Sequence, residues 1–310
     1  MRVTANTFPN ALLNQLSSLS QRQNKLQNQA ATGQIVTLPE DDPVAMRRIL
    51  DLQAENGAMA QYQRNISRHQ ELATATYDSL KALKSLSDKA GEIAIAAGDL
   101  NATSLPIYAK QVTELIKQAV QIANTKNRGD YVFSGTNLDQ TPFVLTTDVN
   151  GVVTAVAYQG NTTVAESEIG SGITLTTRVP GQNNSGTGVR GLLADDRVGA
   201  DFINHLIDLQ NHLLSGDVDS IETNDRAALA RDEDNFLYHV GHNGALQSRL
   251  EASVALISQR MDTLEKLVSK EADADLTETI VRLTQTQTAY QAALQSAGRI
   301  LGSSLLDYLR

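Results

Sequence analysis

The chain has 310 residues, of which 41% are apolar and only 4% aromatic, and it contains no cysteine and no tryptophan. The missing cysteines exclude disulfides, thiolate metal sites and cysteine nucleophiles, and the net charge of −9 argues against a general nucleic-acid-binding protein. No run of about 18 apolar residues is present, so membrane insertion is not expected. The first ten residues lack the pattern of a signal peptide.

The first predicted helix covers residues 8–31. Its apolar positions include Leu12, Leu16, Leu19 and Leu26, and their spacing follows the alternation of four and three residues that is typical of a coiled coil. The opposite face carries Gln, Asn and Ser, and Gly33 is expected to end the helix.

A spacer follows, because Pro39 and Pro43 are too close together to lie inside one helix. Asp42 can cap the next helix, Pro43 suits the first helical position, and Asp41 and Asp42 both favour the positive end of the helix dipole. Helical patterning then continues to about residue 98, and a second helix over residues 104–127 predicts an antiparallel helix hairpin.

The period of the pattern then changes to that of β-strands. We predict strands over residues 131–135, 143–147, 152–158 and 173–179, with Asn150-Gly151 as a hairpin turn. These strands form a small insertion that is rich in Thr and Gly.

Helical patterning returns near Asp195 and, for a long final stretch, near Thr223. After residues 273–275 the pattern slips by one residue. The predicted apolar row then contains Leu276, Ile280, Leu283, Tyr290, Leu294 and Leu301.

The predicted fold is therefore mainly α with a small β insertion. We expect three parts: a terminal helical coiled-coil domain formed by residues 1–42 and 271–310, a helical rod domain formed by residues 43–133 and 191–270, and a surface-exposed β insertion over residues 134–190. The terminal helices are polar and hold few apolar positions, so we expect them to fold on assembly with further copies. The apolar rows of both ends are the predicted assembly seam.

No catalytic, cofactor-binding or metal site is predicted. The five histidines do not form a metal-binding motif, and we interpret them as surface residues. The glycine-rich segment 181–188 lacks the Lys-Ser/Thr ending of a phosphate loop and is interpreted as a turn. Arg128-Gly129-Asp130 is interpreted as the end of a helix before a strand.

Four segments carry a family resemblance. Residues 32–45 read TGQIVTLPEDDPVA, and residues 283–300 read LTQTQTAYQAALQSAGRI. Residues 128–136 read RGDYVFSGT and are followed by TPF at 141–143, and residues 303–309 read SSLLDYL. These segments resemble those of the bacterial flagellins and flagellar hook-associated proteins, and the last two resemble the hook-associated members. One departure is Leu38-Pro39-Glu40, where the family usually has Ser-Pro-Ser.

The resemblance implies a flagellin-like elongated antiparallel helical bundle in which both termini form a coiled coil, and a structural rather than enzymatic role at the junction between hook and filament. The implied partners are further copies of the chain, hook-associated protein 1, flagellin and a flagellar export chaperone. The implied location is the extracellular flagellum, reached through the flagellar type III secretion apparatus without a cleaved signal peptide. Two alternatives remain open: a filament flagellin, and, from another class, a cytosolic coiled-coil scaffold.

Overall fold

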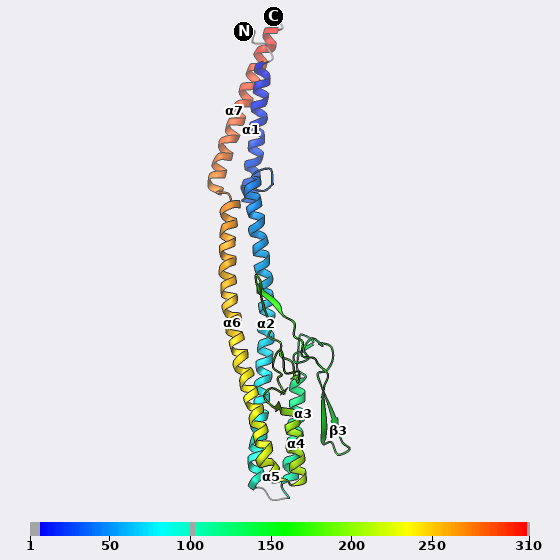
Figure 1. Ribbon diagram of the computed structural model, residues 1–310. Helices are drawn as coiled ribbons and strands as arrows, with labels where there is room; N and C mark the ends of the chain where they lie inside the picture. Colours follow the sequence, from blue (N-terminus) through cyan, green and yellow to red (C-terminus); the bar gives the residue numbers. More distant parts are fainter. Residues whose placement is uncertain (1–6, 100–102, 309–310) are drawn as a thin grey trace. The chain divides into compact units, whose positions relative to one another are not determined.

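The computed structural model describes residues 7–99 and 103–308 and shows a mainly helical chain with a small strand-rich region in the middle of the sequence (Figure 1). The helices are α1 (Thr7–Thr32), α2 (Pro43–Ala96), α3 (Leu105–Ala123), α4 (Phe202–Ser215), α5 (Val218–Ser220), α6 (Arg226–Ala272) and α7 (Leu276–Tyr308), with a 3₁₀ turn η1 (Ala97–Asp99) and a π-helical turn η2 (Ile221–Asp225). The predicted fold class is confirmed. None of the described helices combines the length and the apolar character needed to cross a membrane.

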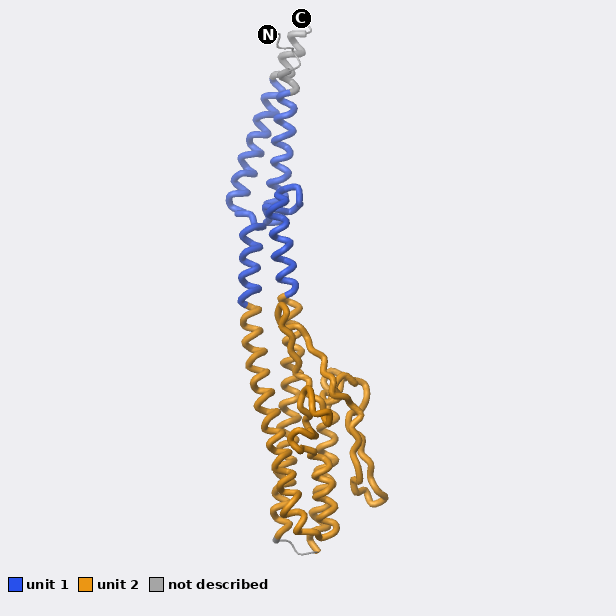
Figure 2. The backbone as a smooth tube through the Cα atoms, in the orientation of Figure 1, with its two compact units in different colours: residues 1–58, 259–310 blue, residues 59–258 orange. Residues whose placement is uncertain are grey.

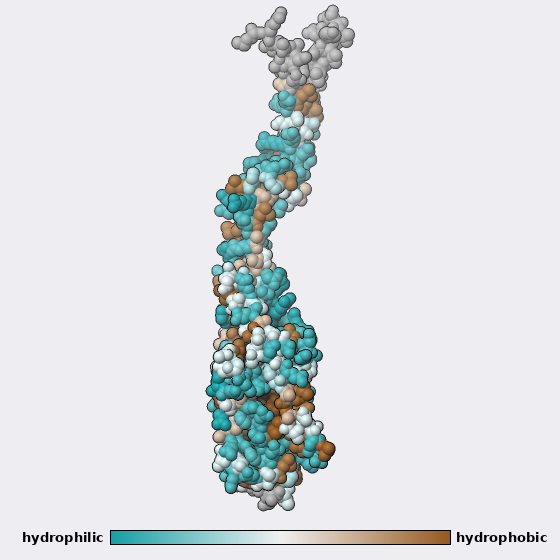
Figure 3. All heavy atoms as spheres, turned by 45° about the vertical axis from the view of Figure 1, so that its right-hand side comes forward, coloured by the Kyte–Doolittle hydropathy of each residue, from teal (hydrophilic) through white to brown (hydrophobic). Residues whose placement is uncertain are grey.

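Contacts along the chain define two compact units, residues 1–58 with 259–310 (unit 1) and residues 59–258 (unit 2), shown in Figure 2. Both boundaries lie inside helices, α2 and α6. The division into three domains that the sequence suggested remains a prediction. On the face shown in Figure 3, both units expose apolar side chains among mostly hydrophilic ones.

The core of unit 2 lies between α3, α4 and the parts of α2 and α6 that belong to this unit. Its largest fully buried side chains include Leu80, Leu83, Ile116, Leu206, Leu209, Leu213, Phe202 and Phe236. The rings of Phe202 and Phe236 meet edge to face with centroids 5.0 Å apart. Burial of each such side chain stabilises the fold by roughly 1.5–3 kcal/mol, so aliphatic residues and few rings are enough to hold these helices together.

The strands of unit 2 are short and pair mainly as hairpins. They are β1 (Lys126–Asn127), β2 (Asp130–Tyr131), β3 (Phe143–Thr147), β4 (Val153–Tyr158), β5 (Ser167–Gly170), β6 (Ile173–Leu175), β7 (Gln182–Asn183), β8 (Ala194–Asp195) and β9 (Ala200–Asp201). Pairs β1–β2, β3–β4 and β5–β6 are antiparallel, and β8 pairs with β7 in parallel and with β9 antiparallel. Phe143 and Val153 are buried in the helical core, so strands and helices of this unit share one core.

Two predicted strands are shorter than expected, and so is one helix. The strand expected over residues 131–135 ends at Tyr131, and the chain then turns at Gly135 (φ +70°), where the Asn137 N–H donates to the Ser134 carbonyl at 3.4 Å. The strand expected over residues 173–179 ends at Leu175, and beyond it the Thr177 hydroxyl lies 3.0 Å from His69 Nδ1 of α2.

Helix α3 ends at Ala123 and not near residue 127, because Asn124 pairs with a strand. Its side-chain amide donates to the Phe143 carbonyl at 2.8 Å and accepts from the Phe143 N–H at 2.9 Å. The tripeptide 128–130 does not end a helix: Arg128 and Gly129, both at positive φ, form the turn between β1 and β2.

The interpretation of the histidines as surface residues was wrong for His69 and His239, which are buried. Two others are partly exposed and pair with carboxylates: His205 Nδ1 lies 2.7 Å from the buried Asp232, and His212 Nδ1 lies 2.8 Å from Asp225. The first pair joins α4 to α6, and the second joins α4 to η2. A sequence pattern cannot show such contacts between different helices.

The pair of His205 and Asp232 predicts a loss of stability at alkaline pH. Burial by itself would lower the pKa of His205, but the hydrogen bond and charge of Asp232 outweigh burial and raise it. A histidine whose pKa is raised by folding stabilises the folded state when it is protonated. This stabilisation is complete below the pKa of the unfolded chain, about 6.5, and is lost as the pH rises through the pKa of the folded state. Urea unfolding between pH 5.5 and 9 should therefore show wild-type stability falling relative to the double variant His205→Gln/Asp232→Asn, whose pair cannot titrate.

The exposed His242, which forms no ion pair among the described residues, offers the matched control. His242→Gln should keep the wild-type pH dependence. Equal pH profiles for wild type and the double variant would contradict the assignment of this pair.

Candidate assembly surface

Helices α1 and α7 come from opposite ends of the chain and lie side by side within unit 1 (Figure 1). On α1 the side chains turned away from solvent include Leu12, Leu16, Leu19 and Leu26, and Leu26 is buried. Together with the half-buried Gln23, these leucines are spaced alternately four and three residues apart. They therefore form one row along α1, and this row faces α7.

The row on α7 that faces α1 is richer in small and polar residues than the predicted one. It consists of Thr279, Leu283, Thr286, Tyr290, Ala293 and Ala297, all buried or half-buried. The Thr286 hydroxyl donates to the Arg282 carbonyl at 2.8 Å, so its burial leaves no donor unpaired. The threonines of this row are not apolar, so the apolar pattern of the sequence did not predict them. The available signal was a Thr, Thr, Ala repeat every seven residues at 279, 286 and 293.

Three predicted seam residues lie beside the buried part of this row. Leu276, Ile280 and Leu294 are 48%, 54% and 45% exposed. At about 100° per residue they lie within about 40° of one another and, on average, about 70° around the helix from the centre of the row that faces α1; the half-buried Leu283, about 20° from Leu276 and Leu294, lies between the two. We call these three residues the α7 stripe. The side chain of Leu301 lies outside the described residues.

The spacer (residues 33–42) is bonded to the turn between α6 and α7. The Ile35 N–H donates to the Ala272 carbonyl at 2.6 Å, and the Ala274 N–H donates to the Gly33 carbonyl at 2.8 Å. Val36 and Ala272 are buried together with Ile49 of α2 in a small apolar cluster. Within unit 1, the two connections that lead into α1 and α7 are therefore fixed to each other.

Asp41 organises the spacer. Its Oδ1 accepts from Lys25 Nζ at 2.8 Å, and its Oδ2 accepts from the Thr37 N–H and hydroxyl and from the Leu38 N–H at 3.2–3.3 Å. The hydrogen bond from Lys25 is the largest of the effects that lower the pKa of Asp41 to about 2. One carboxylate thus joins α1 to the folded spacer.

Asp42 caps α2. Its Oδ1 accepts from the Val44 and Ala45 N–H groups at 3.0 and 2.9 Å, and Pro43 is the first residue of the helix. Pro39 is exposed within the spacer. Further along, Arg260 of α6 pairs with Glu55 of α2 at 2.6 Å on the surface of unit 1.

The low pKa of Asp41 predicts a spacer that resists acid. A carboxylate whose pKa is lowered by folding stabilises the folded state when it is ionised. This stabilisation is complete above the pKa of the unfolded chain, about 3.8, and is lost as the pH falls through the pKa of the folded state. The protection factors of the amides of residues 33–42, which correct for the intrinsic pH dependence of exchange, should therefore stay high from pH 7 to pH 3 and fall only toward pH 2.

The variant Asp41→Asn should exchange several-fold faster in this segment already at pH 7, because it loses the charged bond to Lys25. Glu40→Gln, at an exposed neighbouring position, is the matched control and should exchange as wild type does. Equal exchange in both variants would show that Asp41 does not hold the spacer.

Comparison with known proteins relates this arrangement to flagellar proteins. The family model of the bacterial flagellin N-terminal helical region matches residues 3–138. A flagellar hook-associated protein from Vibrio parahaemolyticus has a similar structure, with a TM-score of 0.61 and 19% identity over 75% of this chain and 100% of that one. FlgL of Bacillus cereus gives a TM-score of 0.54 and 18% identity over 69% of this chain and 97% of its own.

Flagellar hook-associated protein 3 of Legionella pneumophila gives a TM-score of 0.50 and 14% identity over 76% of this chain and 99% of its own. No curated protein matches the chain in sequence. The resemblance that the sequence suggested is confirmed, and the shared fold and the flagellin-type N-terminal region together support a structural role in the bacterial flagellum.

Proposed function

We propose that this protein is a hook–filament junction subunit of the bacterial flagellum, a counterpart of hook-associated protein 3. In this role it forms a short layer between hook-associated protein 1 and the flagellin filament, and copies of the chain contact one another through their terminal helices. It leaves the cell through the flagellar type III secretion apparatus, accompanied before export by a chaperone. Its role is structural and not catalytic.

The observation that carries this proposal is the α7 stripe beside the paired rows of α1 and α7. The single chain covers one face of α7 with α1 and leaves about half of Leu276, Ile280 and Leu294 in water. Removing apolar area of this kind from water favours association by roughly 25 cal/mol per Å². A helix pair with an uncovered apolar stripe is suited to packing against further copies.

Two sequence features favour the junction over the filament. The segment RGDYVFSGT at 128–136 with TPF at 141–143, and the ending SSLLDYL at 303–309, resemble hook-associated members more than flagellins. The similarity to solved hook-associated structures supports the same choice at the level of the fold.

The position of the protein on the organelle tests this proposal. Isolated flagella should be labelled with an antibody against unit 2 and viewed by electron microscopy, with flagella from a strain that lacks the gene as the control. The proposal expects a thin band at the distal end of the hook. Labelling along the whole filament would identify a flagellin, and signal confined to the cytoplasm would identify a scaffold.

A pair of substitutions separates the two faces of α7. Leu294→Asp adds a charge to the α7 stripe, where it stays in water in the single chain; helix content should be unchanged, but assembly should weaken roughly 100-fold or more, because an unpaired charge becomes buried at the contact. Thr286→Asp, about 80° around the helix from Leu294, adds the charge at a buried position of the row that faces α1 and should also disrupt the pairing of α1 and α7 in the single chain.

Circular dichroism of the single chain and sedimentation of assemblies measure both effects. Ser296→Asp, about 180° around the helix from the α7 stripe, is the matched control and should assemble as wild type does. Normal assembly of Leu294→Asp would remove the α7 stripe from the contact between copies.

A further inference from the structure

We propose that a hollow in unit 2, next to α6, binds a sugar acid: a carboxylate at Arg190 and a hydroxyl at His239. The hollow has a volume of about 350 Å³ and lies between the segment that leads from Val179 to Val198 and the side chains of Tyr238, His239 and His242 on α6. This volume is at the lower end of the range of small-molecule sites, roughly 300–1,000 Å³.

Arg190 supplies an uncompensated positive charge. Its guanidinium carbon lies 4.3 Å from the centre of the Tyr238 ring, which holds the group in place by a cation–π contact. Its Nε is buried without a hydrogen-bond partner, and no carboxylate of the described chain pairs with it. A planar guanidinium with free donors fits a carboxylate, which accepts two parallel hydrogen bonds.

The second arginine of the hollow is already occupied. Arg197 Nε and one terminal nitrogen donate to the two oxygens of Asp195 at 2.9 and 2.5 Å, and its other terminal nitrogen donates to the Gly188 carbonyl at 3.0 Å. Asp195 is thereby neutralised, and none of the described residues that line the hollow is acidic. In a chain of net charge −9, this hollow therefore attracts anions.

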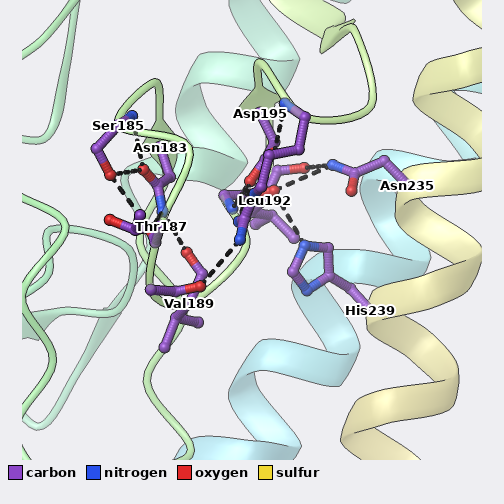
Figure 4. Close-up of polar contacts among 11 residues, drawn as sticks. Asn183, Ser185, Thr187, Val189, Leu192, Asp195, Asn235 and His239 are labelled. Carbon is purple, nitrogen blue, oxygen red and sulfur yellow. Dashed lines mark hydrogen bonds and ion pairs between the residues drawn. The ribbon is translucent and has the colours of Figure 1, made fainter.

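His239 adds an acceptor. Its Nε2 lies 3.0 Å from the Gly191 carbonyl, which can only accept, so Nε2 carries the proton. Burial, together with the charge of Arg190, lowers the pKa of His239 to about 4, so the ring is neutral at pH 7. Its buried Nδ1 then offers a lone pair and has no partner among the described residues. In Figure 4 this nitrogen is the ring nitrogen of His239 that carries no dashed line.

The loop beside His239 is held in place before any ligand arrives. Asn183 Nδ2 donates to the Thr187 and Val189 carbonyls at 2.7 and 2.6 Å. Asn235 of α6 donates to the Gly191 and Leu192 carbonyls at 3.1 and 2.8 Å, as Figure 4 shows. Segment 181–188, interpreted from the sequence as a turn, is thus ordered beside the hollow. Ligand binding therefore loses no conformational entropy in ordering this segment.

A positive charge at Arg190 beside a neutral acceptor at His239 selects the ligand class. A simple anion such as sulfate, which is fully ionised at neutral pH, satisfies Arg190 but offers the neutral Nδ1 of His239 no hydrogen, and a neutral sugar offers a hydroxyl but no charge. A sugar acid carries a carboxylate and neighbouring hydroxyls on one compact ring. Val179, Val189 and Val198 of the hollow give it the apolar surface on which the C–H face of a sugar can pack.

Titration calorimetry of the full chain at pH 7.5 and low salt tests the site with D-galacturonate, D-galactose and inorganic sulfate. Galacturonate should bind at least roughly tenfold more tightly than either of the other two, because galactose lacks the charge and sulfate lacks a hydrogen to donate. Equal affinity for galactose would overturn the role of Arg190, and equal affinity for sulfate would overturn the sugar. Adding trigalacturonate distinguishes a free sugar acid from the end of an acidic polysaccharide, which should bind more tightly.

Variants locate the binding. Arg190→Gln should weaken galacturonate binding at least roughly tenfold. Arg249→Gln, an exposed arginine on the same helix without an ion pair in the described chain, is the matched control and should bind as wild type does. The ¹⁵N resonance of His239 Nδ1 should shift when galacturonate is added to wild type and stay unchanged with galactose or in Arg190→Gln. Binding by Arg190→Gln at wild-type strength, or an unmoved His239 resonance, would place the ligand elsewhere.

Discussion

The apolar side of helix α7 is wider than a single partner helix covers. Within unit 1, α1 covers the row that contains Thr286 and Ala293, and the small residues of that row allow the two backbones to come close. Leu276, Ile280 and Leu294 lie on average about 70° around the helix from this row and stay half in water. The proposed assembly rests on this apolar surface, which α1 leaves uncovered.

The two units use opposite physical strategies. Unit 2 buries large aliphatic side chains and pairs several of its buried polar groups, among them the two Asp–His pairs that join α4 to its neighbours. Among the described residues, unit 1 has fewer fully buried apolar side chains and relies on backbone and carboxylate hydrogen bonds, several of them made by Asp41. Unit 2 can therefore hold an ordered hollow around Arg190 and His239, while unit 1 leaves apolar side chains of α7 exposed, which suits the contacts proposed between copies.

Local patterns in the sequence were enough for the long helices, the fold class and the hairpin turn at Asn150-Gly151. The row on α1 was also predictable, because its leucines follow a single coiled-coil spacing and lie on one face of the helix. The row on α7 was not, because two faces of that helix both suit a coiled coil and only contact with α1 decides between them. The contacts of the histidines were not predictable either. Asp232 and Gly191 meet His205 and His239 only in the folded unit, and their spacing along the chain does not indicate these contacts.

The natural chain contains no cysteine, so a single introduced cysteine reports on one position alone. The most direct test compares thiol labelling of Ile280→Cys in single chains and in assemblies, with Val149→Cys, at a fully exposed position of unit 2, as the reference for general access. The account predicts rapid labelling of both cysteines in single chains and, after assembly, protection of position 280 while position 149 remains reactive. Equally rapid labelling of position 280 in both states would contradict the claim that neighbouring copies cover the α7 stripe.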